Sequence, residues 1–80
     1  MKILIIEDNE PIREELLTLL NFEGYDVIEA NNGLQGYELA KKYLPDLIIS
    51  DIIMPDMDGF DTLHEIRSNS LTSDIPFFFL

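Results

Sequence analysis

The sequence contains no cysteine, which excludes disulfide-stabilised folds and metal sites built from thiolates. A chain without cysteine also fits a reducing compartment. The longest apolar run is far shorter than a membrane span, and the start of the chain does not resemble a secretion signal. We therefore expect a cytoplasmic protein that does not enter a membrane.

Positively charged side chains are scarce in this sequence. Lys and Arg together number 5 against 16 Asp and Glu, which gives a net charge of −11 at pH 7. Because basic side chains supply most non-specific affinity for nucleic acids, this chain alone is not expected to bind them. The charge favours cations and basic partner surfaces instead. A length of 80 residues predicts a single domain over residues 1–80.

Apolar strands and amphipathic helices alternate along the chain. The runs 3–6 and 47–50 are apolar without polar alternation, which indicates strands buried on both faces of a parallel sheet. The order βαβαβαβ is typical of a parallel α/β fold. The expected strands are 3–6, 25–30, 47–50 and 75–80; one helix runs from its cap Asn9 to Gly24, and the others cover 34–44 and 59–67.

Each expected helix has an apolar face at helical spacing. Asp58, with Asp61 three residues later, is interpreted as the cap of the third helix. His64, the only histidine, is interpreted as a surface residue. The side chains expected to point inward are Ile12, Leu16, Leu19 and Leu20 in the first helix, Tyr37, Ala40 and Leu44 in the second, and Phe60, Leu63 and Ile66 in the third.

Acidic residues follow two of the expected strands directly. Glu7 and Asp8 come after the first strand, and Asp51 comes after the third. Because connections between parallel strands are right-handed, covering both faces of the sheet requires the strand order to reverse once. A reversal between these two strands would bring the three acids into one crevice. Repulsion between them must be offset by a proton or a cation, and ligands that are all oxygen suit Mg²⁺.

Asp51 is the candidate for covalent chemistry among the three acids. An aspartate carboxylate can act as a nucleophile toward phosphorus and form an acyl phosphate. Pro55 and Gly59 shape the segment after Asp51, and this loop is expected to leave the carbonyl of Ile53 available as a ligand. The residues therefore indicate a site that handles phosphate with a metal.

Three segments of the chain resemble a known family in their order and spacing. The segments 5–9, 45–51 and 54–60 look like the motifs of the receiver domain of two-component response regulators. This resemblance covers the whole chain. It implies a flavodoxin-like three-layer α/β sandwich with the strand order 2-1-3-4-5, of which these residues would supply 2-1-3-4.

The resemblance also implies a function in phosphorelay signalling. Asp51 would accept a phosphoryl group from a sensor histidine kinase or a phosphotransfer protein. Asp8, Asp51 and the backbone carbonyl of Ile53 would hold Mg²⁺, with Glu7 acting mainly through water. The chain would then be a phosphoacceptor signalling domain and not an enzyme, beyond catalysing its own phosphoryl transfer.

Several parts of a complete receiver would lie beyond Leu80. These are the fourth helix, the fifth strand, the fifth helix, a Ser or Thr that contacts the phosphoryl group, and a Lys that pairs with it. We therefore expect a truncated receiver with impaired activity. The segment 75–80 is apolar and uncharged, so as an edge strand it is expected to promote self-association.

Other functions fit parts of the sequence. A calcium loop would need a ligand where Met54 stands and a helix before it, so it is rejected. An aspartyl-phosphate phosphatase would commonly carry a second acid where this chain has Ile53. A docking or oligomerisation module that is derived from a receiver but independent of phosphorylation remains the alternative. Labelling of Asp51 by acetyl phosphate would distinguish it from a phosphoacceptor.

Overall fold

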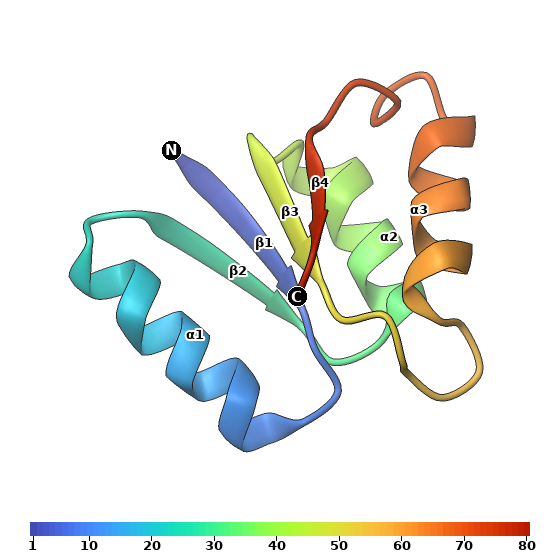
Figure 1. Ribbon diagram of the computed structural model, residues 1–80. Coiled ribbons are helices and arrows are strands. Elements are labelled where there is room, and N and C mark those ends of the chain that lie inside the picture. Colours follow the sequence, from blue (N-terminus) through green and yellow to red (C-terminus); the bar gives the residue numbers. More distant parts are fainter.

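Four parallel strands form one open sheet in the order β2-β1-β3-β4, and helices lie on both of its faces (Figure 1). This arrangement is seen in a computed structural model that describes all 80 residues. It confirms the predicted α/β class and the strand order 2-1-3-4. The elements are β1 (Lys2–Ile6), α1 (Glu10–Phe22), β2 (Asp26–Ala30), α2 (Gly33–Tyr43), β3 (Leu47–Ser50), α3 (Gly59–Ser68) and β4 (Phe77–Phe79).

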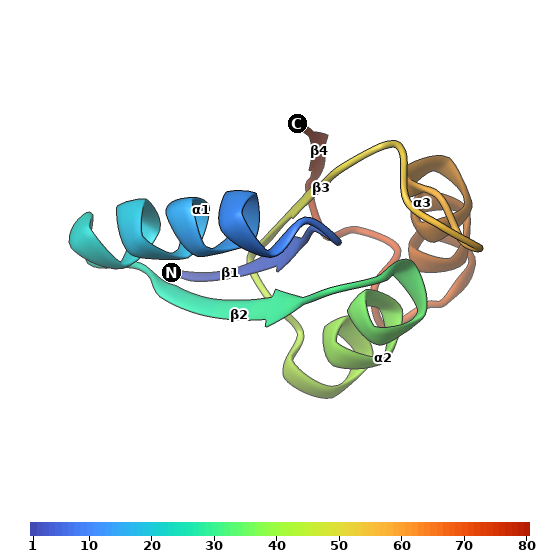
Figure 2. The same ribbon diagram turned by 90° about the horizontal axis from the view of Figure 1, so that it is seen from below.

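The main core lies between the sheet and the helices α2 and α3. Leu4, Ile48 and Phe77 are register partners across β1, β3 and β4; the first two belong to this core and Phe77 packs against it. Side chains alternate between the faces of a strand, so Ile5, Ile49 and Phe78 share the opposite face. Figure 2 shows α1 on that opposite side of the sheet.

Helix α1 covers only the part of its sheet face formed by β1 and β2 (Figure 2). Ile12 and Leu19, which were expected to point inward, are 44% and 63% exposed. That prediction was wrong because α1 packs mainly against β1 and β2, which leaves these two side chains largely in solvent. Phe78 of β4, on the same side of the sheet, is 60% exposed. The sheet therefore has an uncovered apolar face over β3 and β4.

The helices begin at capping side chains, as the sequence predicts for α1 and α3. The carboxylate of Asp58 accepts from the N–H of Asp61 at 2.8 Å, and Asp61 accepts from the N–H of Asp58 at 3.3 Å, which forms a complete capping box. Asn32 caps α2, and its side chain accepts from the N–H of Gln35 at 2.8 Å.

Two further side chains that were expected inside lie outside. Leu44 has a left-handed backbone (φ 49°) that ends α2 before Pro45, and this turn leaves its side chain 50% exposed. Phe60 is 58% exposed at the edge of α3, where its ring packs against Phe79 at 5.0 Å between centroids. Thr62, two residues later in α3, is fully buried, and its hydroxyl donates to the carbonyl of Asp58 at 2.8 Å.

Strand β4 is shorter than the predicted 75–80. The N–H of Ile75 closes a turn onto the carbonyl of Thr72, and Pro76 has no N–H to donate, so the strand begins at Phe77. None of the helices combines the length and apolar character needed to cross a membrane.

Candidate metal and phosphoacceptor site

The register of β1 and β3 places two of the predicted site residues beside each other. Ile6 and Ser50 are partners at the ends of these strands, so Glu7 and Asp51 leave the sheet side by side. Backbone hydrogen bonds hold both positions, since Asp51 N–H donates to the carbonyl of Ile6 and Glu7 N–H to that of Ala30, each at 3.0 Å.

Three predicted acidic residues meet at this edge of the sheet. One carboxylate oxygen from each of Glu7, Asp8 and Asp51 lies within 4.8 Å of the others. Glu7 is only 2% exposed, Asp51 is half-buried and Asp8 is open to solvent. We call these three residues the acid cluster.

Burial of Glu7 gives the acid cluster its distinctive electrostatics. Burial, followed by interactions with Asp8 and Asp51, raises the pKa of the Glu7 carboxyl to about 7, although the N–H of Asn9 opposes the rise by donating to it at 3.2 Å. Neither ion pair of the protein involves these three carboxyl groups, so no Lys or Arg side chain offsets charge on the cluster. Convergent carboxylate oxygens with unbalanced charge fit a hard divalent cation such as Mg²⁺.

The loop after β3 orients the Asp51 carboxylate. Its Oδ1 accepts from the N–H of Ile52 at 2.9 Å, and the carbonyl of Ile52 accepts from Gly59 N–H at 2.7 Å. The start of α3 therefore braces the backbone next to Asp51. The side chain of Ile53 is 83% exposed, and the role of its carbonyl as a metal ligand stays a prediction.

Asp8 faces open space between two loops. A cleft of about 320 Å³ lies between the β2–α2 loop and the β3–α3 loop, lined by Asp8, Asn31, Asn32 and Pro55 among others. The acid cluster is thus approachable from solvent on the side of Asp8, while Glu7 closes it from within.

Arg13 is a residue near the cluster whose role the sequence did not reveal. Its guanidinium Nη1 donates to the backbone carbonyl of Glu7 at 2.9 Å, and its Nε lies 3.0 Å from Oε1 of Glu29. In the sequence it is one of five fixed cations. The only feature of the sequence that hints at this role is the position of Arg13, in the first turns of the helix that follows Glu7 and Asp8.

Comparisons with known proteins decide the family. The family model for the response regulator receiver domain matches residues 3–80. The chain belongs to this family. A solved receiver domain from Methanoculleus marisnigri is 36% identical, with a TM-score of 0.95, and the match covers 98% of this chain and 63% of that one.

Curated relatives of this receiver domain are much longer proteins. It is 40% identical over 75 residues to the transcriptional regulator RpaA from Synechocystis, a match that covers 94% of this chain and 31% of RpaA. It is 45% identical over 74 residues to Histidine kinase P4 from Formosa agariphila, covering 92% of this chain and 5% of that kinase. The receiver domain thus spans a third or less of the length of either relative.

The comparisons and the fold confirm the receiver domain and its flavodoxin-like architecture as they were inferred from the sequence motifs. The structure also brings Glu7, Asp8 and Asp51 together as predicted. His64 is exposed, as predicted.

Proposed function

We propose that this receiver domain accepts a phosphoryl group on Asp51 in a cytoplasmic phosphorelay, from a phosphohistidine of a sensor kinase or phosphotransfer protein. Mg²⁺ would be held by Asp8, Asp51 and the carbonyl of Ile53, with Glu7 acting mainly through water. The observation that carries the proposal is the convergence of three carboxylates at the ends of β1 and β3. The family supports the class of reaction.

In the proposed reaction, a carboxylate oxygen of Asp51 attacks phosphorus while the phosphorus–nitrogen bond of the phosphohistidine breaks. The electron pair of that bond stays on the imidazole, which leaves, and an acyl phosphate forms on Asp51. The N–H of Ile52 holds Oδ1 and so sets the direction of the carboxylate. When bound, Mg²⁺ offsets the negative charge on the phosphoryl oxygens.

Within these residues, only the acidic half of a phosphoryl site is present. No Lys or Arg side chain pairs with a carboxylate of the acid cluster, since the two ion pairs join Arg13 to Glu29 and Lys41 to Glu38. We therefore propose that the 80-residue chain is phosphorylated more slowly than a longer relative such as the chemotaxis protein CheY4 of Vibrio cholerae. The match between the two covers 65% of the CheY4 chain.

Labelling with acetyl phosphate and Mg²⁺, followed by intact mass measurement, tests the phosphoacceptor. We expect the wild-type chain to gain one phosphoryl group and Asp51→Asn to gain none. Asp56→Asn is the matched control, because Asp56 lies in the same loop, outside the cluster, and asparagine tolerates its left-handed backbone (φ 67°). No labelling of the wild type, or labelling that survives Asp51→Asn, would contradict the proposal.

A second proposed property is association between copies through β4, which could serve docking with or without phosphorylation. Two hydrogen bonds to β3 fix which backbone groups of β4 point inward: Ile48 N–H donates to the carbonyl of Pro76, and Leu80 N–H donates to that of Ser50. Because backbone groups alternate in direction along a strand, those of Phe77 and Phe79 face the open edge.

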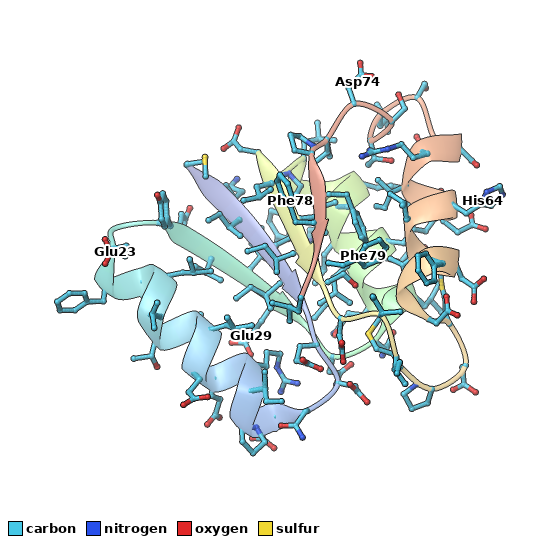
Figure 3. All side chains as sticks on the ribbon, viewed as in Figure 1. Glu23, Glu29, His64, Asp74, Phe78 and Phe79 are labelled. Atoms are coloured by element: carbon cyan, nitrogen blue, oxygen red, sulfur yellow. The ribbon has the colours of Figure 1, made fainter.

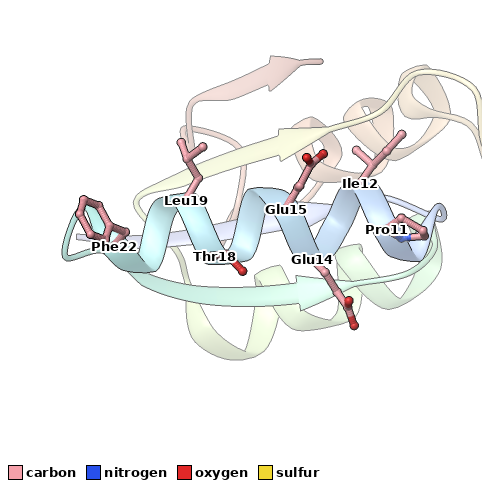
Figure 4. Close-up of a pocket in the computed structure, with 7 residues that line it drawn as sticks. All are labelled: Pro11, Ile12, Glu14, Glu15, Thr18, Leu19 and Phe22. Atoms are coloured by element: carbon pink, nitrogen blue, oxygen red, sulfur yellow. The ribbon is translucent and has the colours of Figure 1, made fainter.

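The uncovered apolar face lies beside this edge. Figure 3 shows Phe78 on β4, and Figure 4 shows Ile12 and Leu19 projecting from the same side of α1 with Glu15 between them. The segment 75–80 carries no charge that would repel its counterpart in a second copy. The β4 strand of a second copy offers matching backbone hydrogen-bonding groups and an equally apolar Phe78. We therefore propose that another copy of this chain binds at the β4 edge.

Sedimentation velocity at micromolar concentration tests this association. The wild type is expected to form dimers or larger species, increasingly so at higher salt, because its net charge of −11 repels other copies. Phe78→Lys should be monomeric. His64→Lys adds the same charge at a residue that points away from α3 (Figure 3) and should associate like the wild type. A monomeric wild type at all salt concentrations would contradict the proposal.

A further inference from the structure

Arg13 connects the acid cluster to the neighbouring strand. It lies in the first turns of α1, where its own N–H donates to the carbonyl of Asn9 at 2.9 Å, and its side chain is only 14% exposed. From there the guanidinium reaches two elements at once. Nη1 donates to the carbonyl of Glu7 at 2.9 Å, and Nε donates to the carboxylate of Glu29 on β2 at 3.0 Å.

The acceptor of the first bond is the peptide group that joins Glu7 to Asp8. Two side chains of the acid cluster are therefore attached to the peptide unit that Arg13 holds. On its other side, Glu7 donates its N–H to the carbonyl of Ala30, the residue after Glu29. The end of β2 thus fixes the backbone of Glu7 twice, directly through Ala30 and indirectly through Arg13.

Arg13 does not neutralise the acid cluster itself. Its guanidinium makes no ion pair with the carboxylates of Glu7, Asp8 or Asp51, and its partner carboxylate is that of Glu29. The charge of the cluster is therefore left for a cation to offset. The guanidinium fork also suits this task, because Nε and Nη1 can each serve a separate acceptor at the same time, whereas a lysine ammonium is a single point.

We propose that Arg13 is a positioning residue, which fixes the Glu7–Asp8 peptide against β2 through Glu29 so that both carboxylates converge with Asp51 on Mg²⁺. This inference rests on the proposed Mg²⁺ site.

Charge and positioning predict opposite effects of removing Arg13. Arg13→Gln takes a positive charge away from the neighbourhood of the cluster, so electrostatics alone would strengthen Mg²⁺ binding. Loss of positioning would weaken it, by about 10-fold if Arg13 acts like other residues that orient metal ligands. The sign of the change in affinity therefore separates the two effects without any measurement of phosphorylation.

The experiment is calorimetric titration of the metal-free 80-residue chain with Mg²⁺, with circular dichroism confirming that each variant is folded. Arg13→Gln is expected to bind about 10-fold more weakly. Arg13→Lys keeps the charge and should still bind several-fold more weakly, so it carries the test if Arg13→Gln does not fold. Arg67→Gln is the matched control, because Arg67 donates to the carbonyls of Ser73 and Ile75 away from the cluster and the change in charge is the same.

Glu29→Ala tests the second half of the connection. If Arg13 and Glu29 act as one unit, adding Glu29→Ala to Arg13→Gln should cause little further loss of Mg²⁺ affinity. Loss of the Glu29 charge alone would weaken binding by the same factor with or without Arg13. Unchanged or tighter binding by folded Arg13→Gln or Arg13→Lys would overturn the assignment while leaving the proposed function intact. A wild-type chain that binds no Mg²⁺ would overturn both.

Discussion

Replacing Glu7 by glutamine is expected to stabilise the metal-free chain at pH 8 by about 3 kcal/mol. The pKa of the Glu7 carboxyl is raised from 4.5 to about 7, chiefly by burial and further by Asp8 and Asp51. At pH 8 the wild type must therefore keep a buried carboxylate ionised beside two others. Glutamine has nearly the same shape, has no charge, and can still accept the N–H of Asn9.

The pH dependence of stability follows from the direction of this shift. Between pH 4.5 and pH 7, Glu7 binds more protons in the folded than in the unfolded chain, so its contribution to stability falls as pH rises through this interval. Below pH 4.5 the carboxyl is protonated in both states and the contribution no longer changes. The difference between Glu7→Gln and wild type should therefore be largest at pH 8 and small at pH 4.5.

Urea unfolding at both pH values, with a chelator present, measures this difference. Glu14→Gln is the control, because Glu14 is an exposed acid on α1 and its replacement should change little at either pH. Added Mg²⁺ at pH 8 should stabilise the wild type more than Glu7→Gln, since a cation offsets charge that the variant lacks. If Glu7→Gln were less stable than wild type at pH 8, the buried Glu7 carboxylate would not be destabilising the folded chain, and the prediction would be wrong.

Features that depend on neighbouring residues in the chain were predictable from the sequence. The apolar runs around Ile5 and Ile48 predicted buried parallel strands, and the acids that follow these strands predicted the cluster. The spacing of Asp58 and Asp61 predicted the capping box. The capping box depends only on residues close together in the chain. The cluster depends on the pairing of β1 with β3, which places the ends of the two strands side by side.

Features that depend on what faces a residue across the fold were not predictable. Ile12 and Leu19 have helical spacing, yet they are exposed because α1 covers only β1 and β2. The sequence likewise could not show that Glu7 is buried while Asp8 is not, or that Arg13 reaches both Glu7 and Glu29. Periodicity identifies an apolar face, but only the packing of other elements decides whether it is covered.

The second large effect is expected from Gly59→Ala, which should destabilise the chain by about 3 kcal/mol. Gly59 begins α3 directly against the segment that carries Asp51. A methyl group there would collide with the carbonyl oxygen of Asp51 and would stand 2.8 Å from Cα of Ile52 and 2.9 Å from the Phe79 ring. Two of these neighbours are backbone atoms in a loop braced by Gly59 N–H itself, so they cannot move aside cheaply.

Thermal unfolding measures the loss, which for a domain of this size corresponds to a fall in Tm of roughly 15 °C. Gly24→Ala is the control, because Gly24 has φ +91° but nothing within 4 Å of an added methyl group, so it should show only the backbone penalty of about 1 kcal/mol. Because the displaced atoms belong to Asp51 and Ile52, Gly59→Ala should also weaken Mg²⁺ binding, whereas Gly24→Ala should not. Equal destabilisation by the two variants would show that the loop yields freely, and that α3 does not brace the phosphoacceptor.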